Sequence, residues 1–202
     1  MGASRVLLAV AFFSFVACSR GPANRATEAD RNAVYAAVLD SLYLGVAQHQ
    51  DHRPVTLVVL SVRTAGIGLA TAAVIDAWRQ TLPAIPLDLW SAFTSANASH
   101  TVLPAIAGLR SQQHVLSSPE EDELFPQDPR NLEAAWSAFY KRFPGSAGIA
   151  NLSNVGFSRD GNWALVGFGR ACASLCAESY DVLLHRIGGN WQIVDTFGGI
   201  VS

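Results

Sequence analysis

The sequence of 202 residues predicts an α+β fold, in which a C-terminal four-stranded antiparallel β-meander over residues 148–201 packs against helices and follows an N-terminal α/β portion. Two dipeptides, Asp160-Gly161 and Gly188-Gly189, are typical two-residue hairpin turns and stand between apolar runs. The segment Cys172–Cys176 suits a third tight turn. Because side chains alternate between the two faces of a strand, these turns place the apolar residues of the meander on one face. Their agreement is the main reason for the predicted fold.

The same turns predict which residues face each other. On the apolar face we expect seven pairs: Val155 with Val166, Phe157 with Ala164, Ala164 with Leu184, Val166 with Val182, Phe168 with Tyr180, Leu184 with Ile193, and Tyr180 with Phe197. The opposite face carries two further rows: Leu165, Leu183 and Val194 in one, and Trp163, His185 and Gln192 in the other. A solvated face would be more polar, so we expect the N-terminal half to cover it. The alternative is a contact surface, with Trp163 and His185 as candidate ligand-binding residues.

The predicted register also places Cys172 opposite Cys176 and Arg170 opposite Glu178. Directly paired strand residues lie close enough for a disulfide. A bridge across so short a loop is worth about 2 kcal/mol or less, so it would pin the turn more than hold the domain. A thiol–disulfide exchange role is the alternative. It is disfavoured because redox-active cysteines are usually two residues apart, at a helix N-terminus where the thiolate is stabilised.

Asp195 breaks the apolar pattern of the meander, because the register places it beside Val182 on the apolar face. A lone buried carboxylate is costly unless it is paired or protonated. One interpretation is a bulge or a different register that takes Asp195 to water. The other is a ligand-binding or catalytic carboxylate that works with His185 or His114, although the register puts Asp195 and His185 on opposite faces.

The first 17 residues are typical of a bacterial export signal. Arg5 supplies the positive charge, and the apolar run Val6–Val16 is too short to span a bilayer. The run ends in Phe15-Val16-Ala17-Cys18, which resembles the lipobox of bacterial lipoproteins. The resemblance implies cleavage before Cys18, lipidation of its thiol and anchoring by acyl chains, with residues 18–28 as a tether. Ser19 rather than aspartate follows Cys18, which favours the outer membrane, facing the periplasm.

The cysteine count agrees with this interpretation. Of the three cysteines in the chain, lipidation would use Cys18 and leave one pair, which an oxidising periplasm would join. The alternative is an ordinary cleaved signal peptide in which Cys18 has no role. Removal of Arg5 with the signal leaves 13 basic against 16 acidic residues, with no basic cluster. Nucleic acid is therefore excluded as an electrostatic partner.

Residues 29–202 suit a single domain of about 170 residues. The periodicity predicts helices over Arg31–Leu44, Ala72–Gln80 and Pro86–Ala96, a strand over Val55–Val62, short strands at 101–103 and 114–116, a helix start at Glu120–Glu123 and a helix from Asp128. Thr27 or Asp30 could cap the first helix. Trp136 and Phe139 of the last helix are expected to bury against the apolar face of the meander.

Motifs for catalysis, metals and cofactors are weak or missing. The polar run Gln48–His52 does not have the spacing of a known metal site, and Gly66-Ile67-Gly68 lacks the third glycine of a dinucleotide-binding turn. There is no Gly-x-Ser-x-Gly elbow, P-loop or His-Glu-x-x-His helix. We therefore predict no catalytic residue, no metal and no cofactor.

The last third of the chain resembles a group of uncharacterised exported bacterial proteins. The resemblance covers Phe139 to Val194 and rests on Phe139-Tyr140, Phe143-Pro144, Gly148, Val155-Gly156-Phe157, Ala164-Leu165-Val166, Cys172, Leu175-Cys176, Tyr180, Leu183-Leu184 and Trp191. This chain has Ala173 and Ala177 where that group has glycine after each cysteine. The resemblance implies that the cysteine loop is a shared feature, and it implies no activity.

Taken together, these features predict a membrane-anchored lipoprotein of the cell envelope that acts as a binding or interaction module for an envelope protein or a small ligand. The alternative is an envelope enzyme that uses Asp195 with a histidine.

Overall fold

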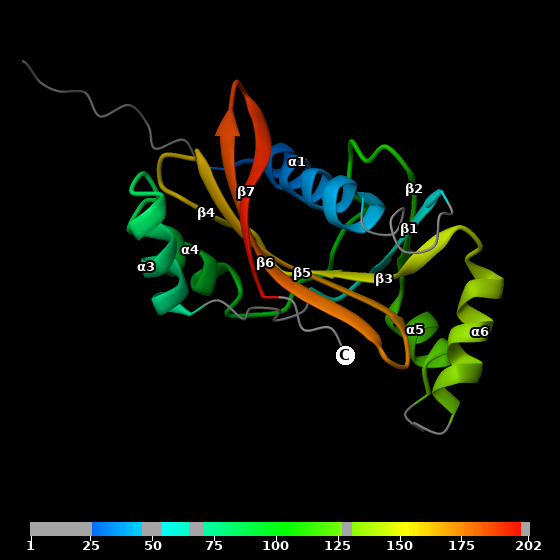
Figure 1. Ribbon diagram of the computed structural model, residues 1–202. Coiled ribbons are helices and arrows are strands. Elements are labelled where there is room, and N and C mark those ends of the chain that lie inside the picture. The colour runs from blue at the N-terminus through cyan, green and yellow to red at the C-terminus, as the bar shows by residue number, and fades with distance from the viewer. Residues whose placement is uncertain (1–25, 46–53, 65–70, 127–130, 199–202) are drawn as a thin grey trace, which may run out of the picture.

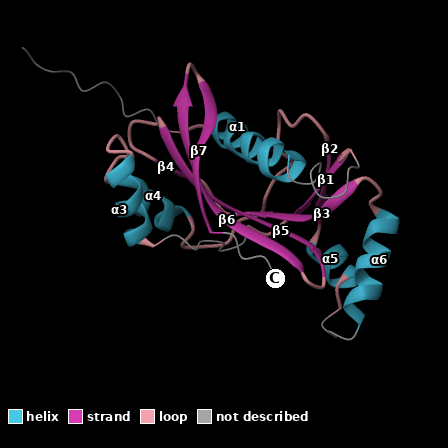
Figure 2. Cartoon of the chain, in the orientation of Figure 1, coloured by secondary structure: helices cyan, strands magenta, loops and turns pink. Residues whose placement is uncertain are grey.

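The structure is a computed structural model that describes residues 26–45, 54–64, 71–126 and 131–198. Its centre is a seven-stranded sheet between two layers of helices (Figures 1 and 2). In the described residues, one helix covers the first face and four helices cover the second. The helices are α1 (Glu28–Val38), α3 (Ala72–Thr81), α4 (Leu89–Ala96), α5 (Ser118–Leu124) and α6 (Leu132–Arg142). The predicted α+β class is confirmed.

The strands run in the order β2-β1-β3-β5-β6-β7, and β4 also pairs with β5. Their bounds are β1 (Leu57–Ser61), β2 (Gln112–Leu116), β3 (Ser146–Leu152), β4 (Gly156–Phe157), β5 (Trp163–Ala173), β6 (Cys176–Ile187) and β7 (Asn190–Gly198). Strands β2, β1 and β3 are parallel, whereas β5, β6 and β7 are antiparallel. The sequence did not suggest the parallel half, because β2 is a polar edge strand and both crossovers hold pairs of short helices.

The meander is confirmed as an antiparallel run, but its first strand is broken in two. Strand β3 pairs with the second half of β5, and β4 pairs with the first half. Ser153 lies in the break: its N–H donates to the carbonyl of Gly167 at 2.9 Å, and its hydroxyl accepts the N–H of Gly167 at 2.7 Å. Val155 lies in the same break, so the prediction that it pairs with Val166 was wrong.

The predicted pairs between β5 and β6 are confirmed, and so is Leu184 with Ile193. A β-bulge then inserts Val194, so that Tyr180 faces Gly198 instead of Phe197. A second bulge at Cys172 places Cys176 opposite Ala173. The prediction that the two cysteines are directly opposed was therefore wrong. Each bulge adds one residue to one strand and moves every later side chain to the other face.

Helix α1 covers the apolar face of the meander. It begins with a reciprocal capping box between Thr27 and Asp30 and continues into a π-helical turn, η1 (Leu39–Tyr43). The side chains it buries share one stripe and contact the first core cluster of the sheet; they are Val34, Tyr35, Val38 and Leu39. The expectation that α6 covers this face was wrong. Trp136 and Phe139 of α6 pack on the second face, against Val59, Leu116 and Ile149, because α5 and α6 form the crossover between two parallel strands.

Helices α3 and α4 cover the other end of the second face. They bury Trp163, Leu165 and Leu183 together with residues of their own and of the loop between them, namely Ile75, Trp78, Ile85, Leu89 and Phe93. The N-terminal half therefore covers Trp163, Leu165 and Leu183, as predicted, but Val194 and Gln192 of the same two rows are exposed.

We expect Gly156→Ala to lower the free energy of unfolding by about 1–3 kcal/mol. A Cβ at Gly156 would fall on backbone atoms of Phe93, so α4 would have to move away from β4. Urea unfolding followed by circular dichroism measures the loss. Gly45→Ala is the matched control, because nothing lies within 4 Å of its Cβ. Equal stability of the two variants would contradict the direct contact between α4 and β4.

Candidate functional site: a groove over helix α1

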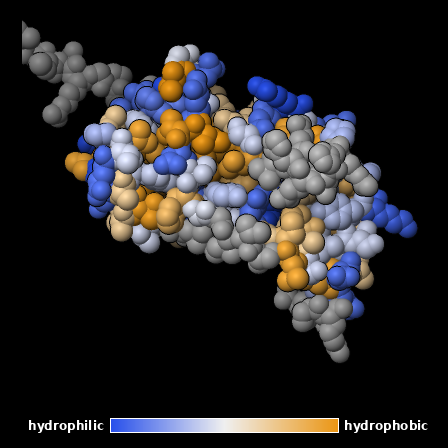
Figure 3. Space-filling view, in the orientation of Figure 1, coloured by the Kyte–Doolittle hydropathy of each residue, from blue (hydrophilic) through white to orange (hydrophobic). Residues whose placement is uncertain are grey.

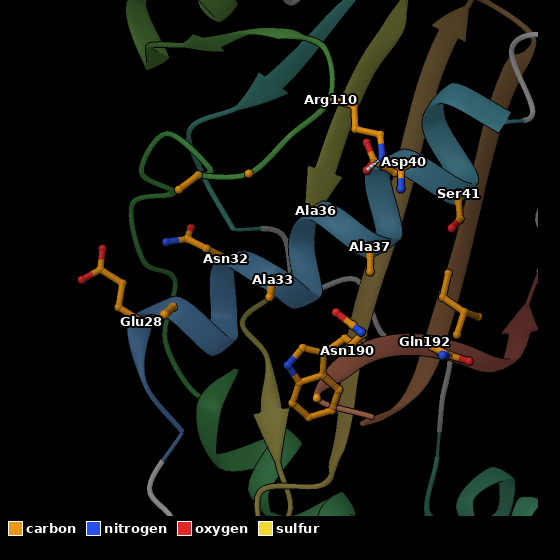
Figure 4. A pocket seen from close by; sticks show the side chains of 16 residues that line it. Glu28, Asn32, Ala33, Ala36, Ala37, Asp40, Ser41, Arg110, Asn190 and Gln192 are labelled. Atoms are coloured by element: carbon orange, nitrogen blue, oxygen red, sulfur yellow. Dashed lines mark ion pairs between the residues drawn. The ribbon is translucent and has the colours of Figure 1, made fainter. Parts of the chain in front are cut away.

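A groove of about 1030 Å³ runs along the outer surface of α1 (Figure 4). Its floor is the helix itself. One wall is the loop 107–110, and the other is the turn and first residues of β7, 189–193. Segments about 70 and 155 residues away from α1 in the sequence thus meet over one helix.

The floor consists of small side chains. Ala29, Ala33, Ala36 and Ala37 occupy the stripe of α1 opposite to the residues that it buries. Alanine is the strongest helix former, so α1 remains helical without large or charged groups on this stripe. Because alanine ends at Cβ, the groove reaches nearly to the helix backbone. This alanine stripe was not predicted, although its spacing is visible in the sequence.

The walls of the groove are polar. Asn32 and Ser41 project from the helix side, and Asn190 projects from the hairpin between β6 and β7 (Figure 4). The side chain of Gln192 alternates to the other face of the sheet, with its ladder partner His185. Glycines 108 and 189 both have positive φ and leave their parts of the walls open. Side-chain amides each carry a donor and an acceptor, so the walls can hydrogen-bond to a polar ligand.

An ion pair holds the hairpin against the N-terminus of α1. The guanidinium of Arg186 pairs with the Asp30 carboxylate and lies 4.6 Å from the centroid of the Trp191 ring. Burial alone would raise the pKa of Asp30, but hydrogen bonds from Thr27 and the charge of Arg186 outweigh it and lower that pKa. Asp30 is therefore ionised at neutral pH and joins the helix cap to the hairpin, so that the groove is preformed.

Charged side chains mark the two ends of the groove. Glu28 is exposed at the first turn of α1. At the other end, Nε of Arg110 lies 3.3 Å from Oδ2 of Asp40. The Arg110 side chain is 84% exposed, and Oδ1 of Asp40 is buried without a hydrogen-bond partner in the described part of the chain. The groove thus has an acidic end and an end with an exposed guanidinium.

Trp163 and His185, which the sequence suggested as ligand-binding residues, are ladder partners with rings stacked 4.2 Å apart. Trp163 is buried under α3 and α4, and His185 is half-buried. The bulge at Val194 brings Asp195 opposite Leu183, on the same face as His185. The predicted placement of these two residues on opposite faces was therefore wrong. Asp195 is half-buried, and its carboxylate accepts the N–H of Thr196 at 2.8 Å.

His114 lies far from this pair, because β2 and β7 form opposite edges of the sheet. Its ring packs on Phe143, and its Nε2 lies 3.4 Å from the Glu120 carboxylate. The structure therefore does not bring His114 together with Asp195.

The fully buried carboxylate of the meander is Asp181, which was not predicted as a site residue. It lies on β6 between Gly167 and Phe197, on the face that carries His185 and Asp195. Asp181 is two residues before Leu183, so the alternation of side chains along the strand places both on the same face. Asp181 was not chosen as a candidate because this face was expected to be only partly apolar. A strip of small and polar residues, including Gly169, Asn151 and Ser179, crosses the sheet next to it.

The outer edge of β7 is a further exposed feature. Apolar side chains gather on the hairpin of β6 and β7 (Figure 3), and Ile187, Val194 and Phe197 are 46, 37 and 40% exposed. The bulge at Val194 and the charge of Asp195 interrupt this edge. Bulges and charges are the usual protection of edge strands against pairing with other chains. We therefore regard the groove, and not this edge, as the candidate site.

Cys172 and Cys176 form the predicted disulfide, with a Cα–Cα distance of 5.1 Å. Cys18, the run Gln48–His52 and the glycines Gly66 and Gly68 lie outside the described residues. Within the described residues, no group of three or more His, Cys, Asp or Glu side chains could hold a metal ion. No helix in the same part of the chain has the length and apolar character to cross a membrane.

No protein-family model, curated protein or solved structure matches this chain. The groove and the N-terminal sequence therefore carry the functional proposal.

Proposed function

We propose that this chain is a lipoprotein of the bacterial cell envelope, anchored through Cys18 in the outer membrane and facing the periplasm, and that its α1 groove binds a partner. The observation that carries the proposal is the position of the groove at the tethered end of the domain. Glu28 both begins α1 and lines the groove. Ten residues from Cys18 to Thr27 span at most about 35 Å when fully extended. The anchor would therefore hold the groove close to the membrane surface.

The cysteines support the same compartment. Cys172 and Cys176 are bonded to each other, and the chain has only one further cysteine, Cys18. Disulfides persist in exported proteins and are rare in the cytosol. Lipidation of Cys18 would leave no free thiol.

We expect Cys18→Ser to remove the protein from the outer-membrane fraction of the envelope. Without the thiol, no acyl chain can be attached to hold the domain there. Cell fractionation and mass spectrometry of the N-terminal peptide measure the change. Retention of the Ser variant in the outer membrane, or an unmodified Cys18 in the wild type, would contradict the anchor.

Occupancy of the groove is testable in the same cells. A photo-crosslinking amino acid at Ala33 should give adducts in the envelope, because Ala33 lies on the floor of the groove. The matched control is Ala138, an exposed alanine on α6 outside the groove. Equal adduct formation at both positions would argue against the groove as the binding site.

The enzyme alternative has one observation in its favour: the bulge in β7 brings Asp195 to the face that holds His185 and the buried Asp181. Two carboxylates and a histidine on one face could serve acid–base chemistry. A hydrolytic activity found in a screen of ester, phosphate and glycoside substrates would favour this alternative if Asp181→Asn and Asp195→Asn abolish it and Ala33→Trp does not.

A further inference from the structure

We infer that the α1 groove binds an extended polypeptide segment of about six residues, with a basic residue at one end and a carboxylate at the other. This inference rests on the proposed binding function of the groove and names the class of its partner. The groove follows the helix axis from Glu28 to Ser41. Fourteen residues at 1.5 Å each give about 20 Å, which is the length of about six residues of extended chain.

The walls of the groove suit an extended backbone. Such a chain presents N–H and C=O groups along its whole length, and they need partners when they leave water. Asn32 and Asn190 offer donors and acceptors on both sides of the floor. A helical partner satisfies its own backbone groups and would leave these amides without use.

The floor of the groove suits the side chains of such a segment. In an extended chain every second side chain points the same way, so alternate residues of the bound segment would face the alanines of α1. Alanine methyl groups leave room for small and medium apolar side chains there. Backbone hydrogen bonds combined with alternate side-chain contacts are the usual mode of extended-peptide recognition.

Other ligand classes fit the groove less well. A sugar ring usually stacks on an exposed aromatic side chain, but Trp191 is the one aromatic among the described residues lining the groove, and it is 8% exposed with Arg186 over its ring. An acyl chain would remove the polar walls from water without replacing their hydrogen bonds, which is costly.

The charges at the two ends set the direction of the bound segment. Glu28 can pair with a basic side chain. Arg110 uses Nε for Asp40, so the rest of its guanidinium fork can bind a carboxylate of the partner. The two ends are separated by the rise from residue 28 to residue 40, about 18 Å. A basic and an acidic group about five positions apart in an extended chain match this separation.

The test uses the mature, lipidated full chain in nanodiscs and a library of random heptapeptides displayed on phage. We expect enriched peptides to share a basic and an acidic residue four to six positions apart. A synthetic peptide of the enriched sequence should bind Ala33→Trp at least about tenfold more weakly, since the indole fills the floor. It should bind Ala138→Trp on α6 like the wild type. No enrichment over empty nanodiscs, or equal binding to both tryptophan variants, would overturn the inference.

Reversing the charge of Arg110 tests the direction of the bound peptide separately from its contact with the alanine floor. Arg110→Glu is expected to weaken the same peptide about fivefold, since an exposed ion pair is replaced by a repulsion. A peptide whose acidic residue is changed to lysine should recover the lost affinity when it binds the Arg110→Glu variant. Because Arg110 is exposed, the variant should fold, and thermal unfolding checks this. Failure of the lysine peptide to recover binding would overturn the assigned direction.

The outcomes separate the peptide inference from the proposed function. Adducts at Ala33 that resist protease, together with a failed peptide selection, would overturn the peptide inference and leave a groove that binds another ligand. No adducts at Ala33 and no enriched peptide would overturn both.

Discussion

Arg170→Met is expected to lower the free energy of unfolding by about 3–5 kcal/mol, among the largest effects of a single substitution in this protein. Nε of Arg170 donates to Oε1 of Glu178 at 2.7 Å across β5 and β6, and the two side chains are only 4% and 8% exposed. Methionine keeps most of the volume but leaves the Glu178 carboxylate charged and buried. The hydroxyl of Tyr180, at 3.3 Å, cannot replace a cation.

The double variant Arg170→Met/Glu178→Leu is expected to recover most of this loss, because removal of both charges leaves no uncompensated ion. Asp76→Asn is the control for an exposed pair. It breaks a 3.2 Å contact with Arg79 in which the Asp76 side chain is 67% exposed, and it should cost less than about 1 kcal/mol. Urea unfolding of the wild type and the three variants measures the loss and its recovery. If Arg170→Met cost no more than Asp76→Asn, the pair would not be buried in solution.

The second large effect is a loss of stability between pH 10 and pH 12. Burial raises the pKa of Tyr35 and of Tyr43 to about 12, above the value of about 10 expected in the unfolded chain. The folded state therefore holds both protons more tightly. This contribution is fully present below pH 10 and is lost as the pH rises towards 12. A rise of two pKa units corresponds to about 3 kcal/mol of folding free energy for each tyrosine.

The measurement is the free energy of unfolding at pH 8, 9, 10 and 11 for the wild type, Tyr35→Phe and Tyr43→Phe. Each variant should lose stability less steeply above pH 10 than the wild type, because one titrating group is gone. Tyr43→Phe should also be less stable at pH 8, since the hydroxyl donates to the Gly148 carbonyl at 2.7 Å and accepts the Ala147 N–H at 3.0 Å. Identical slopes in the three proteins would show that neither hydroxyl resists ionisation.

The local part of the meander could be predicted from the sequence because its turns are short. Gly188 and Gly189 both adopt positive φ in the turn between β6 and β7, which few residues other than glycine tolerate. Once the turn is known, the period of two determines the pairs that follow. The buried pair of Arg170 and Glu178 and the proximity of the two cysteines were therefore visible before the structure.

The bulges were not predictable in the same way. The extra residue Val194 lies within a run that reads as a regular strand, and its position depends on how β7 packs at the edge of the sheet. That single residue places Asp195 on the face opposite to the apolar one. The carboxylate is therefore not buried among apolar side chains, as the predicted register had required. Asp181 was overlooked because a period-two pattern identifies which residues share a face and says nothing about how deeply that face is covered.

The sequence by itself determined the turns, the strand register between bulges, and the cap and amphipathic stripe of α1. Tertiary structure alone decided that α1, and not α6, covers the apolar face of the meander, and that three parallel strands extend the sheet. It also decided that residues 107–110 and 189–193 rise beside the alanines of α1 to form the groove. The physical reason is that periodicity specifies which side chains must be buried together, whereas the element that buries them depends on the path of the whole chain.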